Sequence, residues 1–371
     1  MNTELFNYAA RLREAVSHGQ EAIDQQRFSE LALELFNLQF NHNPAYKKIC
    51  GARQLTPAAV KQWTQIPAVP TVAFKELELS CIPPGERTVA FHSSGTTEQK
   101  PSRHFHHAES LAVYEASLWP WFARHLSVAN PMIFLTPNGT AAPHSSLIYM
   151  FEIVRQKLAL PESAFAGGMA PDGSWILDFP AVLRQLQAAC DSAQPLTLLG
   201  TAFSFVHLLD YLGKNNLHFQ LPNGSRVMET GGYKNRSRTM PKAQLHKLIT
   251  ERLGVPPAQI VCEYGMSELS SQAYAVASQN PAIQPSAFSL QPFRLPPWAR
   301  VQIISPETGR EVGEGQTGII RVFDLANVFS VAAVQTEDLG LKRGDGFELV
   351  GRAEKAEPRG CSLMTLESAA G

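Results

Sequence analysis

A cluster of hydroxyl groups follows the apolar run at residues 88–91 and gives the strongest chemical signal in the chain. Its members are Ser93, Ser94, Gly95, Thr96 and Thr97. Backbone N–H groups and hydroxyls around a glycine can surround phosphate oxygens, and Lys100, just downstream, can add a positive charge. The segment lacks the Gly-Lys-Ser/Thr ending of a Walker A loop. Taken alone it is better explained as a polar surface turn, so its neighbours must decide.

A second cluster follows the apolar run at residues 260–262. Tyr264 and Gly265 come first, and Glu268 follows them. Open α/β sheets contact ligands where a strand ends in a turn, so Tyr264 can pack on a base or an acyl chain. Glu268 offers an oxygen ligand to Mg²⁺. Taken alone, Tyr264 is better explained by core packing and Glu268 as a solvated cap.

A third cluster lies near the C-terminus, where residues 335–340 are predicted to form a turn. Its Asp338 can accept hydrogen bonds from both hydroxyls of a ribose. Arg352, downstream, can supply positive charge to a phosphate or ribose. Each cluster is ordinary by itself, and the three become informative through their order and spacing.

The elements that must position these clusters alternate between strands and helices. Strands are predicted at 88–91, 131–135, 196–199, 224–228 and 259–263, and helices at 146–158, 181–190 and 241–253. This alternation is typical of a mainly parallel sheet covered by helices, so the predicted fold class is α/β. Short strands at 300–304, 318–323 and 347–350 predict a β-rich C-terminal subdomain. The chain is therefore divided into a helical N-terminal region over 1–90, an α/β core over 91–292, a β-rich subdomain over 293–350 and a tether over 351–371.

Composition excludes several classes of partner. The formal net charge is -1, so no long-range positive field would hold nucleic acid or an anionic membrane. The five cysteines are far apart and form no Cys-x-x-Cys pair, which suits a reducing compartment. Neither a signal peptide nor a run of about 20 apolar residues is present. We therefore expect a cytoplasmic protein without membrane or nucleic-acid partners.

With these elements placed, the sequence resembles the adenylate-forming superfamily of acyl-CoA ligases, adenylation domains and luciferases. Residues 93–102 resemble its phosphate loop, residues 264–268 its Tyr-Gly-x-Thr-Glu motif, and Asp338 its ribose-binding aspartate. More closely, the chain is similar to the acyl-protein synthetases of bacterial bioluminescence fatty-acid reductase systems. Supporting segments are residues 143–147, 200–205, 229–234 and 359–362, so the resemblance covers the chain from about residue 90 to its end.

The resemblance implies an adenylate-forming N-terminal-domain fold and an ATP-dependent enzyme that requires Mg²⁺. Such an enzyme activates a long-chain fatty acid as an acyl-adenylate and then transfers the acyl group to its own Cys361. An acyl-protein reductase, and an acyl-transferase in the same complex, would be its partners. The resemblance further implies that the usual C-terminal domain, with its adenylation lysine, is missing. The alternatives are a CoA or carrier-protein ligase in which Cys361 is incidental, and a non-catalytic scaffold subunit of a reductase complex.

Further site residues follow from the same resemblance. Gly231, Gly232 and Tyr233 resemble the loop that lies against the adenine, although a strand-to-helix turn also favours Gly-Gly. His144 and Lys100 are candidates for stabilising charge on oxygen, with Cys361 as the acyl acceptor. For His144, a backbone-bonded position near a helix cap is the alternative interpretation.

Overall fold

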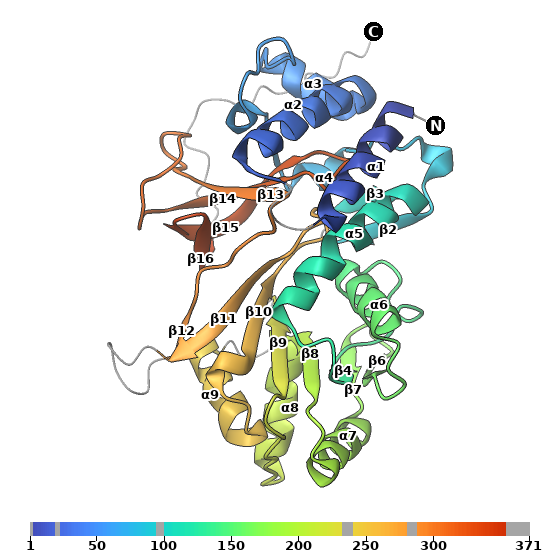
Figure 1. Ribbon diagram of the computed structural model, residues 1–371, viewed down its shortest axis with the longest axis vertical. Coiled ribbons are helices and arrows are strands. Elements are labelled where there is room, and N and C mark those ends of the chain that lie inside the picture. The colour runs from blue at the N-terminus through green and yellow to red at the C-terminus, as the bar shows by residue number, and fades with distance from the viewer. Residues whose placement is uncertain (1–2, 19–22, 94–99, 232–239, 280–287, 354–371) are drawn as a thin grey trace.

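Two large β-sheets, two two-stranded sheets and the helices around them make up the described part of the chain (Figure 1). The computed structural model describes residues 3–18, 23–93, 100–231, 240–279 and 288–353. The predicted α/β fold class is confirmed, with mainly parallel pairing in the larger sheet, whereas the second sheet is mainly antiparallel.

The larger sheet has seven strands in the order β12-β11-β10-β9-β8-β4-β5. The strands from β10 to β5 pair in parallel, whereas β11 and β12 are added antiparallel. Their bounds are β12 Phe288–Leu290, β11 Ala273–Gln279, β10 Ile260–Tyr264, β9 Arg226–Thr230, β8 Thr197–Thr201, β4 Met132–Phe134 and β5 Ala164–Phe165. Parallel pairing brings the carboxyl ends of β8, β9 and β10 to one edge, where the motifs of the second cluster lie.

Helices cover both faces of this sheet because its strands bury side chains on both sides. Along β4, Phe134 packs into one hydrophobic cluster and Ile133 into another, and Met228 and Val227 divide in the same way along β9. Helices α5 (Ala108–His125) and α6 (Ser146–Leu158) contribute to the first cluster. Helices α7 (Phe179–Ser192), α8 (Ala202–Lys214) and α9 (Lys242–Leu253) contribute to the second.

Local capping explains where one of these helices begins and where another ends. Ser145 precedes α6, and its hydroxyl accepts a hydrogen bond from the Ile148 N–H, as an N-cap does. Gly254 ends α9 in the left-handed conformation with φ of 70°, which glycine adopts without steric cost. The helices predicted at 146–158 and 241–253 are confirmed.

The second sheet has five strands and brings the third cluster to the first sheet. Its strands are β1 Val69–Pro70, β13 Ala299–Ile304, β14 Thr317–Asp324, β15 Ala333–Arg343 and β16 Gly346–Arg352. The predicted turn at 335–340 is wrong, because Asp338 lies inside the long strand β15, opposite Arg352 of β16. Polar side chains hid this strand in the sequence, since much of β15 is only partly buried.

The remaining elements are N-terminal helices, two hairpins and short 3₁₀ turns. The helices α1, α2 and α3 lie at one end of the molecule, beside the second sheet (Figure 1). The bounds are α1 Thr3–Ser17, α2 Gln25–His42, α3 Pro44–Ala52, α4 Ala73–Glu76, β2 Val89–His92, β3 Arg103–His106, β6 Gly167–Met169 and β7 Trp175–Leu177. The 3₁₀ turns are η2 Trp63–Gln65, η3 Pro84–Glu86 and η4 Pro257–Gln259.

A buried polar junction joins the two sheets. The Asp324 carboxylate, at the end of β14, accepts hydrogen bonds from the backbone N–H groups of Ser270 and Ser271 at 2.9 and 2.8 Å. The side-chain amide of Asn327 donates to the carbonyl of Glu268 at 2.9 Å, and Gln39 of α2 donates to the carbonyl of Asn327 at 2.7 Å. The segment that follows Tyr264 is therefore held by the second sheet.

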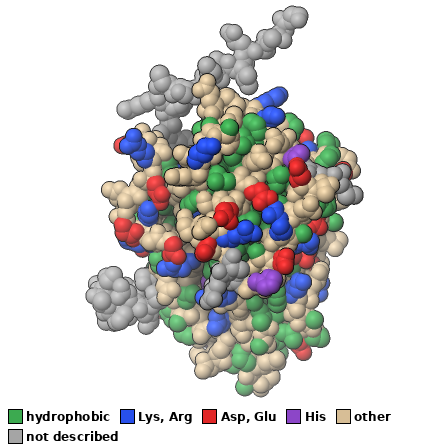
Figure 2. All heavy atoms as spheres, turned by 45° about the horizontal axis from the view of Figure 1, so that its top comes forward, with side chains coloured by type: hydrophobic (Ala, Val, Ile, Leu, Met, Phe, Trp, Pro, Cys, Tyr) green, Lys and Arg blue, Asp and Glu red, His purple; other side chains and the backbone are tan. Residues whose placement is uncertain are grey.

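The surface carries no dominant charge on the face that Figure 2 shows, where acidic and basic side chains are interspersed. This agrees with the net charge of -1. Among the described helices, none combines the length and the apolar composition that crossing a membrane requires.

Candidate active site

The candidate site lies at the carboxyl edge of the parallel strands. Thr201, Thr230 and Glu263 are neighbours there, since Thr230 pairs with Thr201 of β8 and with Glu263 of β10. Open parallel sheets bind ligands beyond this edge because the connecting turns diverge there and expose their backbone groups. The turns at Gly231 and Gly265 start at this edge.

Hydrogen bonds bring the first cluster next to the second. Ser93 follows β2 and Ser102 precedes β3, so both lie at the base of the loop that joins these strands, and the Ser102 N–H donates to the Ser93 hydroxyl at 3.0 Å. The hydroxyl of Ser102 lies 3.4 Å from that of Ser267, which donates to the Glu268 carboxylate at 3.0 Å. A continuous chain of polar groups thus connects the base of the candidate phosphate loop to Glu268. The loop residues Ser94, Gly95, Thr96 and Thr97 lie outside the described residues.

The second cluster contacts the third through Tyr264. Its phenol donates to Asp338 Oδ2 at 2.9 Å, and the Arg352 guanidinium lies 3.4 Å from Asp338 Oδ1. Burial raises the pKa of Tyr264 well above its ordinary value, so the phenol keeps its proton and can donate. The Tyr264 ring packs edge-on against Phe347 of β16, with ring centroids 5.2 Å apart. Asp338 is therefore positioned from both sheets.

Two glycine turns flank a buried carboxyl group that the sequence analysis did not single out. Glu263 accepts a hydrogen bond from the Thr230 hydroxyl, and burial raises its pKa to about 7. A Cβ on Gly265 would collide with Glu263 Oε1, so a larger residue there would have to displace the carboxylate from its bond with Thr230. Gly231 has φ of 74°, which favours glycine. The sequence did contain a signal for Glu263, since it is a single carboxylate within an otherwise apolar strand. Gly232 and Tyr233 lie outside the described residues.

His144 packs beside the first cluster. Its Nδ1 lies 3.0 Å from the carbonyl oxygen of Ala90, to which only a protonated Nδ1 can donate. The ring stacks on His92 with centroids 4.4 Å apart and planes 14° from parallel. The pKa of His92 is lowered by burial and by the neighbouring His144. These contacts fix the ring orientation of His144 at the start of the candidate phosphate loop.

Of the other two candidate catalytic residues, the structure describes only Lys100, and it does not join this arrangement. Lys100 forms an exposed ion pair with Glu76 at 3.6 Å, with about half of the Lys100 side chain accessible. Cys361 lies outside the described residues. The roles of both residues stay predictions.

Glu268 is suited to Mg²⁺ by the chemistry of its oxygen atoms. It is buried, and one carboxylate oxygen already accepts from Ser267. No group of three metal-ligand side chains in the described ranges includes Glu268. One carboxylate is nevertheless sufficient, because Mg²⁺ in nucleotide sites keeps several waters and takes its other ligands from substrate phosphates. The residues present therefore fit the ion.

Comparisons with known proteins place the chain in a family. A family model described as acyl-protein synthetase, LuxE, matches residues 15–369. Two relatives, from Aliivibrio fischeri and Vibrio harveyi, are both named long-chain-fatty-acid–luciferin-component ligase. The first is 24% identical and aligns over 90% of this chain and 86% of its own length. The second is 23% identical and aligns over 91% and 87%, respectively.

Solved structures share the fold. An open conformation of 2-hydroxyisobutyryl-CoA ligase, in complex with 2-HIB-AMP and CoA, matches with a TM-score of 0.62 at 14% identity. The match covers 88% of this chain and 69% of the ligase. McyG A-PCP complexed with phenylalanyl-adenylate matches with a TM-score of 0.51 at 15% identity, over 83% of this chain and 47% of that protein. The described architecture is thus that of adenylate-forming ligases.

Proposed function

The chain belongs to the LuxE family of acyl-protein synthetases and is a ligase, and we propose that it activates a long-chain fatty acid with ATP. The observation that carries the proposal is the contact between clusters far apart in the sequence. Tyr264 binds Asp338, and Ser102 connects Ser93 to the Glu268 segment. The described residues of the clusters that resemble phosphate, magnesium and ribose sites are thus linked by hydrogen bonds, which supports the proposal.

In the first reaction step, a carboxylate oxygen of the fatty acid attacks the α-phosphorus of ATP. The bond from this phosphorus to the pyrophosphate oxygen breaks, which gives acyl-adenylate and pyrophosphate. The protein contributes by positioning the reactants and stabilising charge on oxygen. Ser93 and the hydroxyls after it would bind phosphate, Asp338 would accept from the ribose hydroxyls, and the turn at Gly231 would lie against adenine. Mg²⁺ held by Glu268 would spread the charge of the phosphates.

In the second step, the acyl group moves to Cys361. The thiolate attacks the acyl carbon, the bond to the AMP oxygen breaks, and AMP leaves with the electron pair. The thiol proton goes to solvent. Arg359 stands two positions before Cys361 in the sequence, and a nearby positive charge favours a thiolate. An acyl-protein reductase would then receive the acyl group, with an acyl-transferase as a further member of the complex.

Acid-dependent ATP/pyrophosphate exchange separates the two steps. We expect Cys361→Ser to retain exchange with a long-chain fatty acid but to lose the hydroxylamine-labile acyl group seen by intact mass. Cys190→Ser is the matched control, because Cys190 is a partly exposed thiol that should leave both measurements unchanged. Acylation that persists in Cys361→Ser would refute the thioester at this residue. Exchange that is absent with every fatty acid, alone and with a reductase, would support the scaffold alternative.

Adding CoA distinguishes the proposed acyl-protein synthetase from its nearest alternative, a CoA ligase. A CoA ligase would release AMP faster when CoA is added, whereas the proposed enzyme would form the acyl-protein at the same rate without it. The matching 2-hydroxyisobutyryl-CoA ligase makes this comparison necessary, since its fold alone does not identify the acceptor. Mass increments after incubation with mixed fatty acids would report chain preference at the same time.

A further inference from the structure

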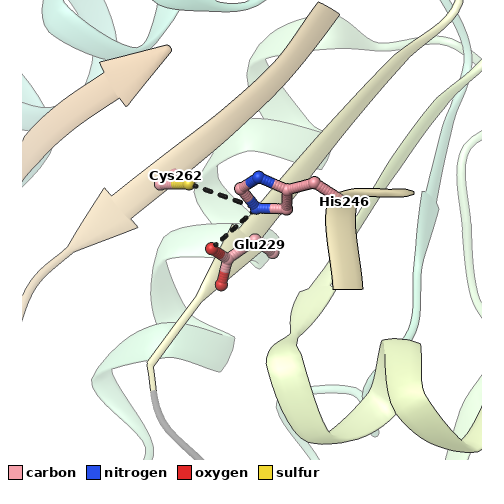
Figure 3. A group of neighbouring side chains, drawn as sticks. All are labelled: Glu229, His246 and Cys262. Carbon is pink, nitrogen blue, oxygen red and sulfur yellow. Dashed lines mark hydrogen bonds and ion pairs between the residues drawn. The ribbon is translucent and has the colours of Figure 1, made fainter. Parts of the chain in front are cut away.

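Three buried side chains that can bind a metal converge beside the candidate site (Figure 3). Glu229 lies on β9, Cys262 is its neighbour on β10, and His246 projects from α9. Each residue is at most 1% exposed, and one ligand atom from each lies within 4.8 Å of the others. The sequence analysis assigned no role to these residues.

The same ring nitrogen faces both other residues. His246 Nε2 lies 3.7 Å from Cys262 Sγ and 3.4 Å from Glu229 Oε1. One nitrogen can hold only one proton, so it cannot donate to both atoms. A nucleophilic Cys-His-acid triad would instead place the acid on one ring nitrogen and the nucleophile on the other. Three electron-pair donors that converge on one point fit a shared cation better.

The two separations from His246 match those of a tetrahedral metal centre, and the sulfur and the carboxylate oxygen lie within 4.8 Å of each other. Zinc bonds of about 2.3 Å to sulfur and about 2.0 Å to nitrogen and oxygen imply an N···S separation of about 3.6 Å and an N···O separation of about 3.3 Å. The observed separations from His246 Nε2 are 3.7 Å to sulfur and 3.4 Å to oxygen. Small side-chain movements would therefore complete the geometry. A thiolate, an imidazole and a carboxylate are ligands that Zn²⁺ accepts together.

Glu229 supplies a second, independent observation. Its Oε2 atom is buried and has no hydrogen-bond partner, whereas Oε1 accepts from the Lys242 ammonium at 2.8 Å. A carboxylate oxygen has two lone pairs, so Oε1 can bind an ion while it accepts from Lys242, and the unpartnered Oε2 lies on the same carboxylate. Metal-binding carboxylates commonly accept a further hydrogen bond that orients them, as Glu229 does from Lys242.

We propose that Glu229, His246 and Cys262 bind one Zn²⁺ ion, with the fourth ligand position left for water, at a site distinct from the proposed magnesium position at Glu268. Binding breaks the S–H bond of Cys262, releases its proton to solvent and forms a sulfur–zinc bond. The ion would join β9, α9 and β10. The turn residues Gly231 and Gly265 stand two residues after Glu229 and three residues after Cys262, just beyond the strand ends at Thr230 and Tyr264, so the ion would stiffen the edge that positions them.

Cobalt spectroscopy on the full chain tests the site without any activity measurement. Metal-stripped protein titrated with Co²⁺ should develop a thiolate-to-cobalt charge-transfer band and the visible bands of tetrahedral Co²⁺, saturating at one ion per chain. One equivalent of Zn²⁺ should abolish both. Cys262→Ser should lose the charge-transfer band and weaken Co²⁺ binding by at least about 100-fold, since removing a ligand exceeds the 10- to 100-fold cost of removing its hydrogen-bond partner.

Two cysteine variants control for the other thiols. Cys50→Ser replaces an equally buried cysteine outside the cluster, and Cys361→Ser replaces the proposed acyl acceptor. Both should keep the complete spectrum. A charge-transfer band that survives in Cys262→Ser, or no saturable band in the wild type, would overturn the proposal. If circular dichroism shows that Cys262→Ser is unfolded, the thermal stability of the wild type provides the test. Zn²⁺ should raise the Tm of the metal-stripped wild type, and an unchanged Tm would refute the site.

Discussion

Replacing Asp324 by alanine should weaken the junction between the two sheets, at the point where the second sheet holds the candidate site. Asp324 is fully buried at the end of β14. Its carboxylate accepts from the N–H groups of Ser270 and Ser271 at 2.9 and 2.8 Å, from the Ser271 hydroxyl at 2.7 Å and from the N–H of Ala326 at 3.0 Å. Three of these four donors lie just after Glu268, on the segment of the first sheet that the second sheet holds.

The expected loss follows from these donors. Leaving a buried donor without an acceptor costs about 1 to 3 kcal/mol, and water entering the space of the lost carboxylate would recover part of that cost. Burial raises the pKa of Asp324, so removing the buried charge also returns some stability. We therefore expect Asp324→Ala to lower the free energy of unfolding by about 3 to 5 kcal/mol, less than the sum over four donors.

Urea denaturation of matched variants measures this loss. Asp345→Ala is the control, because Asp345 is an exposed aspartate paired with Arg294, and such pairs contribute about 1 kcal/mol or less. Asp324→Asn keeps one acceptor oxygen and should fall between the wild type and Asp324→Ala. ATP/pyrophosphate exchange should fall with stability in the Asp324 variants only. Equal unfolding midpoints for Asp324→Ala and Asp345→Ala would refute the anchoring role of this carboxylate.

Three further predictions concern the site itself. Tyr264→Phe removes a hydrogen bond to the Asp338 carboxylate and should lower the free energy of unfolding by about 1.5 to 3 kcal/mol; the KM for ATP should rise because Asp338 loses the contact that orients it, and an unchanged KM would contradict the prediction. Gly265→Ala forces a Cβ against Glu263 and should cost about 1 to 3 kcal/mol in urea denaturation, with exchange reduced in parallel. Burial lowers the pKa of His104 from 6.5 to about 4, so its contribution to stability is complete above pH 6.5 and is lost as pH falls towards 4. The wild type should therefore lose about 3 kcal/mol more than His104→Gln between pH 7 and pH 4, and equal losses would refute this assignment.

The elements of the first sheet could be predicted because local chemistry and the fold agree there. Ser145 caps α6 and Gly254 ends α9, so both helices are visible from a few neighbouring residues. The strands β4, β8 and β10 are apolar because helices cover both of their faces. The same strands carry the second cluster at their carboxyl edge, which is why Tyr264 and Gly265 could be located from the sequence.

Asp338 shows why the third cluster was misplaced. Its neighbours Thr336 and Glu337 are polar, so the segment has the composition of a turn. It forms the strand β15 because β14 and β16 provide backbone partners on its two sides. Such pairing is a tertiary effect that overrides local preference. The hydrogen bond from Tyr264 could not be predicted from a local pattern either, because the two residues are 74 positions apart in the sequence.

The contacts from the second sheet give the candidate site its common physical basis. One end of the segment from Tyr264 to Ser271 is held by the bond from Tyr264 to Asp338, and the other end by the bonds from Ser270 and Ser271 to Asp324. Both aspartates belong to the second sheet. A shift of that sheet must therefore move the candidate ribose ligand and the Glu268 segment together. This coupling explains how residues far apart in the sequence can form one site, although they lie on different strands and turns.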